Sequence, residues 1–472
     1  KRLGLPVGYH IYNWHKIPFN NDYPYYFPVK DGFKESIDEF HENNVYIMPY
    51  INARLVDTRT SDLSTEKFER EFSEGAVRDV NGNLCIETYA SHEPDGSLCQ
   101  LAVMCPSSHI WREALAEIIR KMSKECHVDG VYLDLTEIDT IDLANPWWDQ
   151  QAVNDLSING SLFVALGDIN TQDNDGTWII YFNKRLAAEM CADYDFYEMV
   201  DNDEWNFDNF IKICKGITYN SNNDDILDEN DTWAFGTELY NIYVHALSAG
   251  ERIASKDDDD MPYITLQTEG MYNALHKITD FYSDTTTVMI ANDGRFNNKG
   301  YSNVWEATII KAFTDGRELF YMGGLMNLTG FRSMEDDFGM LPIPKMYADQ
   351  DRYYHSVSPS KTSALAIPRT VQNVEDLGLV IEAIAAMSKN IVTPEYYDRT
   401  LKLQATRDDD SGRMLDIIFA SRVFDLGAIY NWGGVCAQIY NTDPNYASRF
   451  EAVADKAESE MEETLEILVE FN

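Results

Sequence analysis

The chain has 472 residues, with 38 Lys and Arg against 79 Asp and Glu, so its formal net charge is −41. The length predicts two or three domains, and the 44% hydrophobic and 12% aromatic content argues against disorder. This acidity excludes nucleic acid and anionic membrane surfaces as main partners, because both require clustered Lys and Arg. Seven scattered cysteines show no zinc-binding spacing and predict buried free thiols, so neither a metal nor another cofactor is expected.

The first part of the chain alternates strand and helix signals. Strands are predicted over residues 7–14, 45–51, 98–104 and 128–133, and helices over 32–43, 65–72 and 110–123. Strands separated by helices are typical of parallel βα units, and hence of a doubly wound sheet or a barrel. After residue 136 the charge per residue becomes about twice as negative, which indicates two different segments.

The second part is richer in helices, again in an α/β pattern. Helices are predicted over 205–214, 268–282, 374–389 and 446–468, and short strands over 177–182, 338–342 and 363–367. No apolar run approaches the ~18–20 residues of a membrane span, so no transmembrane segment is expected. The chain opens without Met or an apolar signal region, so any export signal is expected to have been removed or never present.

Four ordered motifs in the first part carry a resemblance to a known family. They are GYHIYNWHKIPFNNDYPYYFP (8–28), YIMPYINARLVD (46–57), MCPSSHIWREAL (104–115) and DGVYLDL (129–135). This part resembles an uncharacterised bacterial family with glycoside-hydrolase-like (β/α)8 barrels. The resemblance implies that residues 1–135 form about half of such a barrel.

Chemistry in these barrels lies at the carboxyl ends of the strands. The residues expected at that rim are His10, Trp14, His15, Asn52, Arg54 and Asp134. In related barrels an Asp at the position of Asp134 commonly acts as nucleophile, so the resemblance implies that role, and Trp14 is a candidate for stacking on a sugar face. The alternative is that Asp134 caps a strand-to-loop turn. Glycoside hydrolysis ordinarily needs two carboxyl groups, and the barrel pattern stops before a second one appears.

A different resemblance begins near residue 135. The motifs that carry it include LTEIDTIDLANPWWDQQAVNDLSINGSLFVALGDI (135–169), IIYFNKRLAAE (179–189), FGMLPIPK (338–345) and MLDIIFASRVFDLGAIYNWGG (414–434). They resemble the extracellular solute-binding proteins of bacterial ABC importers that capture sugars and oligosaccharides. The resemblance implies an extracellular or cell-surface lipoprotein with two α/β lobes, and ABC permease subunits as partners.

Sugars are held by aromatic faces, with Asp and Asn side chains at the hydroxyl groups. The ligand-binding candidates in expected loops are Trp178, Trp233, Tyr240, Trp305, Tyr430 and Trp432, with Asp173, Asn174 and Asp175 as polar partners. Any single Trp is more often core than platform; of Trp147 and Trp148 at least one is expected to be structural. The motif Ser358-Pro359-Ser360-Lys361 formally matches SxxK, but Pro359 disfavours the helix that motif needs, so chance is the better account.

The fold prediction is an α/β chain in which a partial barrel-like segment (1–135) precedes a two-lobed periplasmic-binding-protein-like region (136–472) without its usual N-terminal portion. The leading functional hypothesis is capture of an oligosaccharide for an ABC importer, in a chimeric chain. One alternative is a glycoside hydrolase that uses Asp134 as nucleophile. Another is a non-functional chimera in which neither site is complete.

Overall fold

The computed structural model describes the chain except residues 1–6, 12–13, 18–20, 42–44, 50, 53, 61–62, 80, 106–107, 127–134, 368–372, 397–408 and 471–472. The chain divides into two compact units. Unit 1 comprises Lys1–Leu133 with Ile367–Gln372, and unit 2 comprises Asp134–Ala366 with Asn373–Asn472. Each unit is described separately below.

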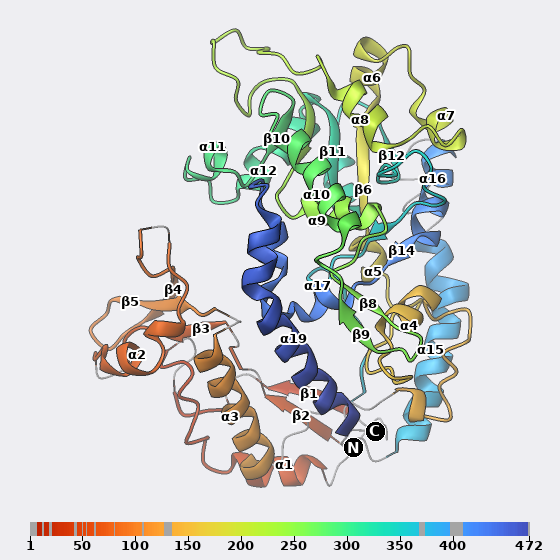
Figure 1. Ribbon diagram of the computed structural model, residues 1–472. Coiled ribbons are helices and arrows are strands. Elements are labelled where there is room, and N and C mark those ends of the chain that lie inside the picture. Colours follow the sequence, from red (N-terminus) through yellow and green to blue (C-terminus); the bar gives the residue numbers. More distant parts are fainter. Residues whose placement is uncertain are drawn as a thin grey trace. The chain divides into compact units, whose positions relative to one another are not determined.

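Unit 1 contains two small sheets and three α-helices in its described residues (Figure 1). Its elements are β1 (Val7–Ile11), α1 (Phe33–His41), β2 (Val45–Pro49), β3 (Leu55–Asp57), α2 (Glu66–Glu71), the 3-10 turn η1 (Ser73–Gly75), β4 (Ile86–His92), β5 (Leu98–Val103) and α3 (His109–Cys126). Strands β1 and β2 pair in parallel, as a βα unit predicts. Strands β3, β5 and β4 form a separate antiparallel sheet in that order.

The described residues of unit 1 form no barrel, so that part of the fold prediction is corrected. The predicted strand at 98–104 exists as β5, but it pairs antiparallel with β4. A tight turn joins the two strands, with the Glu93 amide donating to Ser97 O at 2.8 Å and Gly96 in the left-handed region. A connection this short allows only an antiparallel pair, because parallel strands need a crossover of a dozen or more residues. The predicted strand at 128–133 lies outside the described residues.

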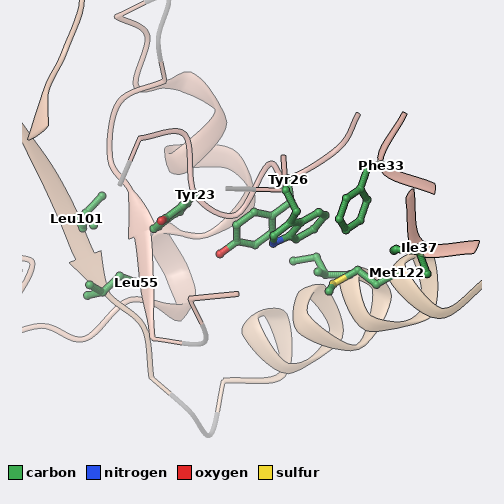
Figure 2. Packing of buried hydrophobic residues seen from close by; sticks show 9 residues of the cluster. Tyr23, Tyr26, Phe33, Ile37, Leu55, Leu101 and Met122 are labelled. Atoms are coloured by element: carbon green, nitrogen blue, oxygen red, sulfur yellow. The ribbon is translucent and has the colours of Figure 1, made fainter. Parts of the chain in front are cut away.

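Aromatic side chains build the core of unit 1 (Figure 2). Trp14 is 1% exposed and stacks on Tyr26 and Phe33, with ring centroids 5.4 and 5.6 Å away. Leu55 and Met122, from β3 and α3, complete the same cluster. Burial of these large aromatic side chains stabilises the unit.

Unit 2 carries most of the secondary structure (Figure 1). Its strands are β6 (Trp178–Asn183), β7 (Trp233–Thr237), β8 (Ala254–Lys256), β9 (Pro262–Ile264), β10 (Val288–Ile290), β11 (Glu318–Gly324), β12 (Phe338–Leu341), β13 (His355–Ser356) and β14 (Arg422–Val423). Its longer helices are α8 (Phe207–Cys214), α9 (Asn241–Ser248), α10 (Glu269–Tyr282), α15 (Val374–Pro394), α16 (Asp409–Ala420) and α19 (Tyr446–Glu470).

The remaining helices of unit 2 are short. They are α4 (Gln150–Leu156), α5 (Gln172–Asp175), α6 (Lys184–Met190), α7 (Phe196–Asp201), α11 (Gly294–Asn297), α12 (Val304–Ala307), α13 (Ile309–Thr314), α14 (Leu328–Phe331), α17 (Leu426–Tyr430) and α18 (Cys436–Ile439), with 3-10 turns η2 (Leu135–Glu137), η3 (Leu325–Asn327) and η5 (Trp432–Gly434). Some of these short helices directly precede or follow a strand of the central sheet, as α6 follows β6 and α13 precedes β11.

The central sheet of unit 2 has five strands in the order β10-β7-β11-β6-β12. Strands β10, β7 and β11 run parallel, whereas β6 is antiparallel to both β11 and β12. Every residue of β7 and β11 is buried, as is usual for the inner strands of α/β sheets. This mixed α/β sheet confirms the α/β class predicted from the sequence.

A buried carboxyl group lies inside this sheet. Glu318, the first residue of β11, is fully buried, and its side chain crosses the neighbouring Gly236 of β7. A Cβ atom at Gly236 would lie 2.2 Å from the Glu318 carboxylate oxygens, so only glycine fits there. Burial raises the pKa of Glu318 well above its ordinary value.

Helix starts in unit 2 follow the capping residues of the sequence. The side chain of Asn206 accepts a hydrogen bond from the Asn209 amide at 3.1 Å and caps the start of α8. Thr268 caps α10 in the same way through the Met271 amide. Trp205, just before the α8 cap, is fully buried and packs against Phe210 with ring centroids 5.8 Å apart, as a hydrophobic staple does. The predicted strand at 363–367 is reduced to one bridge between Leu365 and Ala165.

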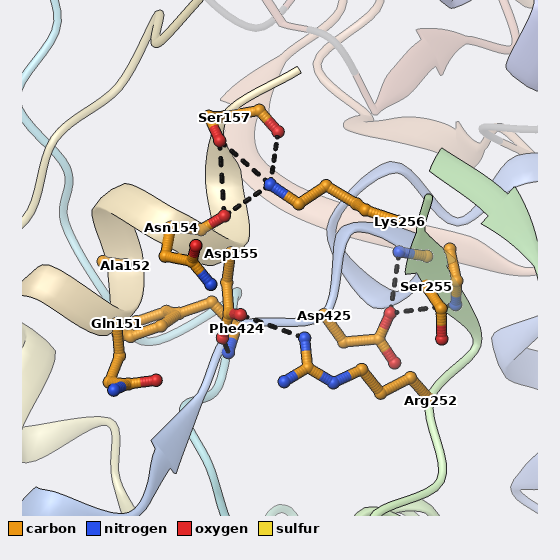
Figure 3. A network of polar contacts seen from close by, with 12 residues as sticks. Gln151, Ala152, Asn154, Asp155, Ser157, Arg252, Ser255, Lys256, Phe424 and Asp425 are labelled. Atoms are coloured by element: carbon orange, nitrogen blue, oxygen red, sulfur yellow. Dashed lines mark hydrogen bonds and ion pairs between the residues drawn. The ribbon is translucent and has the colours of Figure 1, made fainter. Parts of the chain in front are cut away.

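A polar network joins three distant segments of unit 2 (Figure 3). Asp155 accepts hydrogen bonds from Arg252 at 3.1 Å and from the Phe424 amide at 3.0 Å. Asp425 is buried and accepts from the Ile253 amide at 2.7 Å, while Lys256 donates to Ser157 O at 3.0 Å. These bonds fix the β8–β9 hairpin to α4 and to the start of α17.

Helix α15 corrects the expectation that no segment has the length and composition of a membrane span. Its 21 residues include an apolar window of mean hydropathy 1.2, of which 17% is buried. Between residues 377 and 394 the charged side chains are Glu382 and Lys389, and both bond to other parts of unit 2. Its exposed apolar residues are Leu379, Val380, Ile384, Met387, Ile391 and Val392.

Candidate functional site

A cavity of about 400 Å³ lies within unit 2. This volume is in the range of small-molecule sites, which are mostly apolar with a few polar groups. The lining combines aromatic, polar and apolar residues: Gly176, Trp178, Glu238, Tyr240, Asn303, Trp305, Ile310, Tyr321, Gly324, Met326, Asn327, Ser358, Ser360 and Lys361. Three of the predicted ligand-binding residues, Trp178, Tyr240 and Trp305, are therefore brought together.

The topology of the central sheet explains this convergence. Trp178 is the first residue of β6 and pairs with Gly324, the last residue of β11. Glu238 and Tyr240 follow the carboxyl end of β7, which runs parallel to β11. Because β6 is antiparallel, its amino end meets the carboxyl ends of β7 and β11 at one edge of the sheet. Ligands of open α/β sheets bind at such edges.

Two aromatic rings form one wall of the cavity. The ring centroids of Trp178 and Tyr240 are 5.2 Å apart. Trp178 Nε1 is buried and has no hydrogen-bond partner among the described residues. Burial raises the pKa of Tyr240, and the nearby hydroxyl groups of Ser356 and Ser358 oppose that rise. The wall therefore offers two aromatic ring faces and one hydrogen-bond donor, Trp178 Nε1, that has no acceptor among the described residues.

The cavity lining also includes a carboxylate that accepts a hydrogen bond from an indole. Trp305 Nε1 donates a hydrogen bond to Glu238 Oε2 at 2.7 Å. Burial raises the pKa of Glu238, while this bond and the charge of Lys361 counteract the rise. Trp305 lies on α12, whose start is fixed by the Asn303 side chain accepting from the Glu306 amide at 3.2 Å. The Trp305 ring, 38% exposed, is thus oriented from two sides.

The other aromatic candidates of unit 2 do not line this cavity. Trp233 is fully buried at the opposite end of β7, where its indole donates to Asp228 O at 2.7 Å. Trp432 is 2% exposed and donates to Thr464 of α19 at 2.9 Å. Tyr430, which is 40% exposed, stacks on Trp432 with ring centroids 4.9 Å apart. Trp233 and Trp432 therefore serve the core.

The predicted polar partners Asp173, Asn174 and Asp175 do not line the cavity and contact other protein groups instead. Asn174 Oδ1 accepts a hydrogen bond from Arg422 at 2.7 Å, and Asp173 lies 3.5 Å from the same guanidinium group. Asp175 Oδ1 accepts from the Tyr396 hydroxyl at 2.6 Å. Burial raises the pKa of Asp173 to about 6, although the Arg422 charge opposes this. These three residues fix α5 beside the cavity edge.

Trp147 and Trp148, of which at least one was expected to be structural, both bond to the same side chain of α15. Trp147 Nε1 and Trp148 Nε1 donate to the two carboxylate oxygens of Glu382, at 2.6 and 2.9 Å. The Asp142 amide donates to the same carboxylate at 2.7 Å. One side chain of α15 therefore holds the whole loop that precedes α4.

Replacing Glu382 by Gln is expected to lower the free energy of unfolding by about 1–2 kcal/mol. The amide places an N–H group against an indole N–H group, so one of the two tryptophans loses its acceptor. Urea unfolding followed by near-ultraviolet circular dichroism measures both the stability and the tryptophan environment. Glu375→Gln, at an exposed position of the same helix, is the control and should change stability by less than about 0.5 kcal/mol. Equal effects of the two substitutions would contradict the anchoring role.

The rim candidates of unit 1 do not form an open site in the described residues. Trp14 and His15 are each 1% exposed, and burial lowers the pKa of His15. Trp14 therefore has no free face for a sugar. Asn52 Oδ1 accepts from the Arg54 and Leu55 amides at 3.0 and 2.9 Å and shapes the turn before β3.

The remaining rim candidates are Arg54, His10 and Asp134. The guanidinium group of Arg54 pairs with the Glu87 carboxylate of β4. His10 lies in β1, but its side chain is outside the described part. Asp134 lies outside the described residues, so its nucleophilic role stays a prediction. Across the described residues no cluster of His, Cys, Asp and Glu has the geometry of a metal site.

The cavity includes polar residues that the sequence did not identify: Glu238, Asn303, Asn327, Ser358, Ser360 and Lys361. Ser358, Ser360 and Lys361 belong to the motif set aside as a chance SxxK match. Ser358 is buried, and its hydroxyl lies 3.1 Å from that of Ser360. The position of Glu238 directly after a buried strand was the available signal, since ligand contacts concentrate at such ends.

Sequence comparison finds known relatives for the N-terminal part of the chain. Residues 1–146 match a protein family described as a domain of unknown function, DUF6259. A protein of Bacteroides thetaiotaomicron named "Putative glycoside hydrolase" is 38% identical over 134 residues, which cover 28% of this chain and 18% of that protein. A protein of Monosiga brevicollis, "Putative glycoside hydrolase 22789", is 26% identical over 146 residues, 28% of this chain and 12% of that protein. The chain thus spans less than a fifth of the length of these relatives.

Solved structures are similar over nearly the whole chain. The sugar-binding protein MalE from Xanthomonas citri aligns with a TM-score of 0.49 and 14% identity, covering 98% of this chain and 97% of that one. An ABC substrate-binding protein from Listeria monocytogenes in complex with cycloalternan aligns with a TM-score of 0.43 and 12% identity, covering 99% and 100%. The N-terminal region is thus similar in sequence to two proteins named as putative glycoside hydrolases.

Proposed function

We propose that the protein binds a carbohydrate in the cavity of unit 2 without cleaving it. The observation that carries this proposal is the meeting of Trp178, Tyr240 and Trp305 with hydrogen-bonding side chains around one cavity. Aromatic faces pack against the C–H surfaces of sugars, and carboxylate, amide and hydroxyl groups bond to sugar hydroxyls.

The finer form of the proposal is capture of an oligosaccharide outside the cytoplasm, for delivery to the permease of an ABC importer. It is supported by the resemblance of residues 136–472 to extracellular solute-binding proteins. The acidic composition, with a pI near 4.4, suits a neutral or cationic ligand.

Calorimetric titration with a panel of neutral di- and trisaccharides tests the proposal. Trp305→Ala is expected to weaken binding at least about tenfold, because the ligand loses an aromatic platform worth roughly 1.4 kcal/mol or more. Trp305 is partly exposed, so its removal should leave the fold intact. Tyr263→Ala, at a 48% exposed position outside the cavity, is the matched control. No binding across the panel, or equal binding by both variants, would exclude the cavity as a sugar site.

Glycoside hydrolysis is a second candidate, favoured by the similarity of the N-terminal region to proteins named as glycoside hydrolases. It requires Asp134 as nucleophile, as the sequence resemblance implies. The test is turnover of a panel of aryl glycosides by the wild type and by Asp134→Asn. Turnover that disappears in the variant would support hydrolysis, and its absence in the wild type would remove this candidate.

A further inference from the structure

Two charged side chains line the cavity, and they lie in very different surroundings. Glu238 is half-buried and Lys361 is exposed. Glu238 directly follows β7, which is buried along its whole length, so its carboxylate enters the cavity from the sheet. Lys361 stands on the segment after β13, where water surrounds its ammonium group. Their effects on a charged ligand therefore differ in size.

The carboxylate of Glu238 is fixed and partly dehydrated. Its Oε2 atom accepts the hydrogen bond from Trp305 Nε1 at 2.7 Å. Its other oxygen is not engaged in any hydrogen bond of the described residues and is available to accept from a ligand hydroxyl. Charges in such surroundings interact several-fold more strongly than charges in bulk water.

The ammonium group of Lys361 has no ion-pair or hydrogen-bond partner among the described residues. An exposed charge of this kind contributes little to binding, because water and salt screen it. In a cavity of about 400 Å³, any ligand group lies within roughly one Debye length, ~8 Å, of both charges. Glu238, whose charge is better buried, therefore has the larger effect on whether a charged ligand binds.

The hydrogen-bonding groups of the cavity need a ligand that both donates and accepts hydrogen bonds. Trp178 Nε1 is a buried donor without a partner in the described structure, so it requires an acceptor oxygen. The free oxygen of Glu238 requires a donor. A sugar hydroxyl serves both, whereas an ionised carboxylate only accepts.

We propose that the cavity selects uncharged sugars over sugars that carry a carboxylate, and that Glu238 is the residue that sets this specificity. The inference rests on the proposed carbohydrate binding and adds the class of sugar. A uronate within about 5 Å of Glu238 meets a like charge at an effective dielectric constant near 20, which weakens binding by about a hundredfold.

The experiment compares each neutral trisaccharide that binds with its C6-oxidised uronate, by calorimetry at pH 7.5. The wild type is expected to bind the neutral sugar about a hundredfold more tightly. Glu238→Gln should reduce this ratio at least tenfold, mainly by raising uronate affinity. Glu306→Gln, an exposed position next to Trp305 that does not line the cavity, changes the net charge equally and should leave the ratio unchanged.

The possible results separate the two proposals. If no sugar of either class binds, carbohydrate binding itself fails. If sugars bind but the wild type does not prefer the neutral form, only the inferred specificity is overturned. The same holds if Glu238→Gln weakens neutral and uronate binding by an equal factor, because that is the result of a merely structural role.

A measurement on the wild type covers the case in which Glu238→Gln fails to fold. Because burial raises the pKa of Glu238, acid neutralises this carboxylate before it neutralises the uronate, so the ratio should fall as the pH is lowered from 8 towards 4. The groups facing Glu238 are Trp305, Lys361 and the tyrosines Tyr240, Tyr282 and Tyr321, whose pKa values are raised by burial, so the tyrosines stay neutral in this range. The uronate itself stays ionised down to about pH 4. A ratio independent of pH would overturn the assignment to Glu238.

Discussion

Replacing Arg422 by Met is expected to lower the free energy of unfolding by about 3–5 kcal/mol. Its guanidinium group bonds to Asn174 at 2.7 Å and pairs with the carboxylates of Asp149 and Asp173. These two carboxylates are 7% and 2% exposed. Without the arginine both become buried charges with no cation, and this penalty exceeds the value of the ion pairs themselves.

The exposed Arg413 provides the matched control for this experiment. It pairs with Asp201 and Asp410 at 2.8 Å, but its side chain is 49% exposed. Arg413→Met is therefore expected to cost less than about 1 kcal/mol. Urea unfolding at pH 7 measures both variants. Similar losses in the two would show that burial does not decide the strength of these ion pairs. Adding Asp173→Asn to Arg422→Met should recover part of the loss.

Replacing His245 by Leu is expected to make the protein less sensitive to acid. His245 lies on α9, fully buried, with its ring 4.9 Å from that of Phe207 and 5.9 Å from that of Tyr282. Burial lowers its pKa from 6.5 to about 3. The unfolded chain therefore takes up a proton below pH 6.5 that the folded chain does not take up until about pH 3. This difference removes stability as the pH falls through that interval.

The size of the effect follows from the pKa difference. Between pH 7 and pH 4 the wild type should lose about 3 kcal/mol more than His245→Leu, since each unit of pH below 6.5 removes about 1.4 kcal/mol. Urea unfolding at both pH values measures this difference. His276→Leu, an exposed position on α10, is the control. If the wild type and His245→Leu lose the same stability between the two pH values, His245 does not contribute to acid unfolding.

The long helices were predictable because local signals agree with tertiary packing. Helix α10 has Thr268 as its N-cap and an apolar stripe on one face, and both are visible in the sequence. Helix α8 begins after Asn206 for the same reason. In unit 1 the parallel pair of β1 and β2 also follows from the strand-helix-strand pattern.

The antiparallel sheet of unit 1 was not predictable from the alternation of strands and helices. Strands β3 and β4 were missed, because β3 has three residues and the exposed tip of the β4–β5 hairpin breaks the apolar pattern. Resemblance to a barrel family then favoured parallel pairing for residues 98–104. The tight turn at 93–97 overrides that expectation, since backbone geometry decides the strand direction.

Part of the candidate site followed from residue type, and part required the topology. Trp178, Tyr240 and Trp305 are aromatic residues near expected loops, which was enough to select them. Their convergence depends on β6 running antiparallel to β11, and no local pattern specifies that direction. Trp233 was selected by the same reasoning but lies at the other end of β7. Glu238 was passed over because a lone acidic residue in a chain with 79 of them carries little information.

The crossing of Glu318 over Gly236 has a consequence for the divergence of this chain. Any side chain at position 236 would collide with the carboxyl group inside the sheet. Substitutions at these two positions therefore depend on each other. A residue larger than Gly236 can be accepted only after Glu318 has been replaced by a smaller residue. Among sequences that share this sheet, the two positions are expected to change together, and an alignment deep enough to show pairwise covariation would reveal them as a coupled pair.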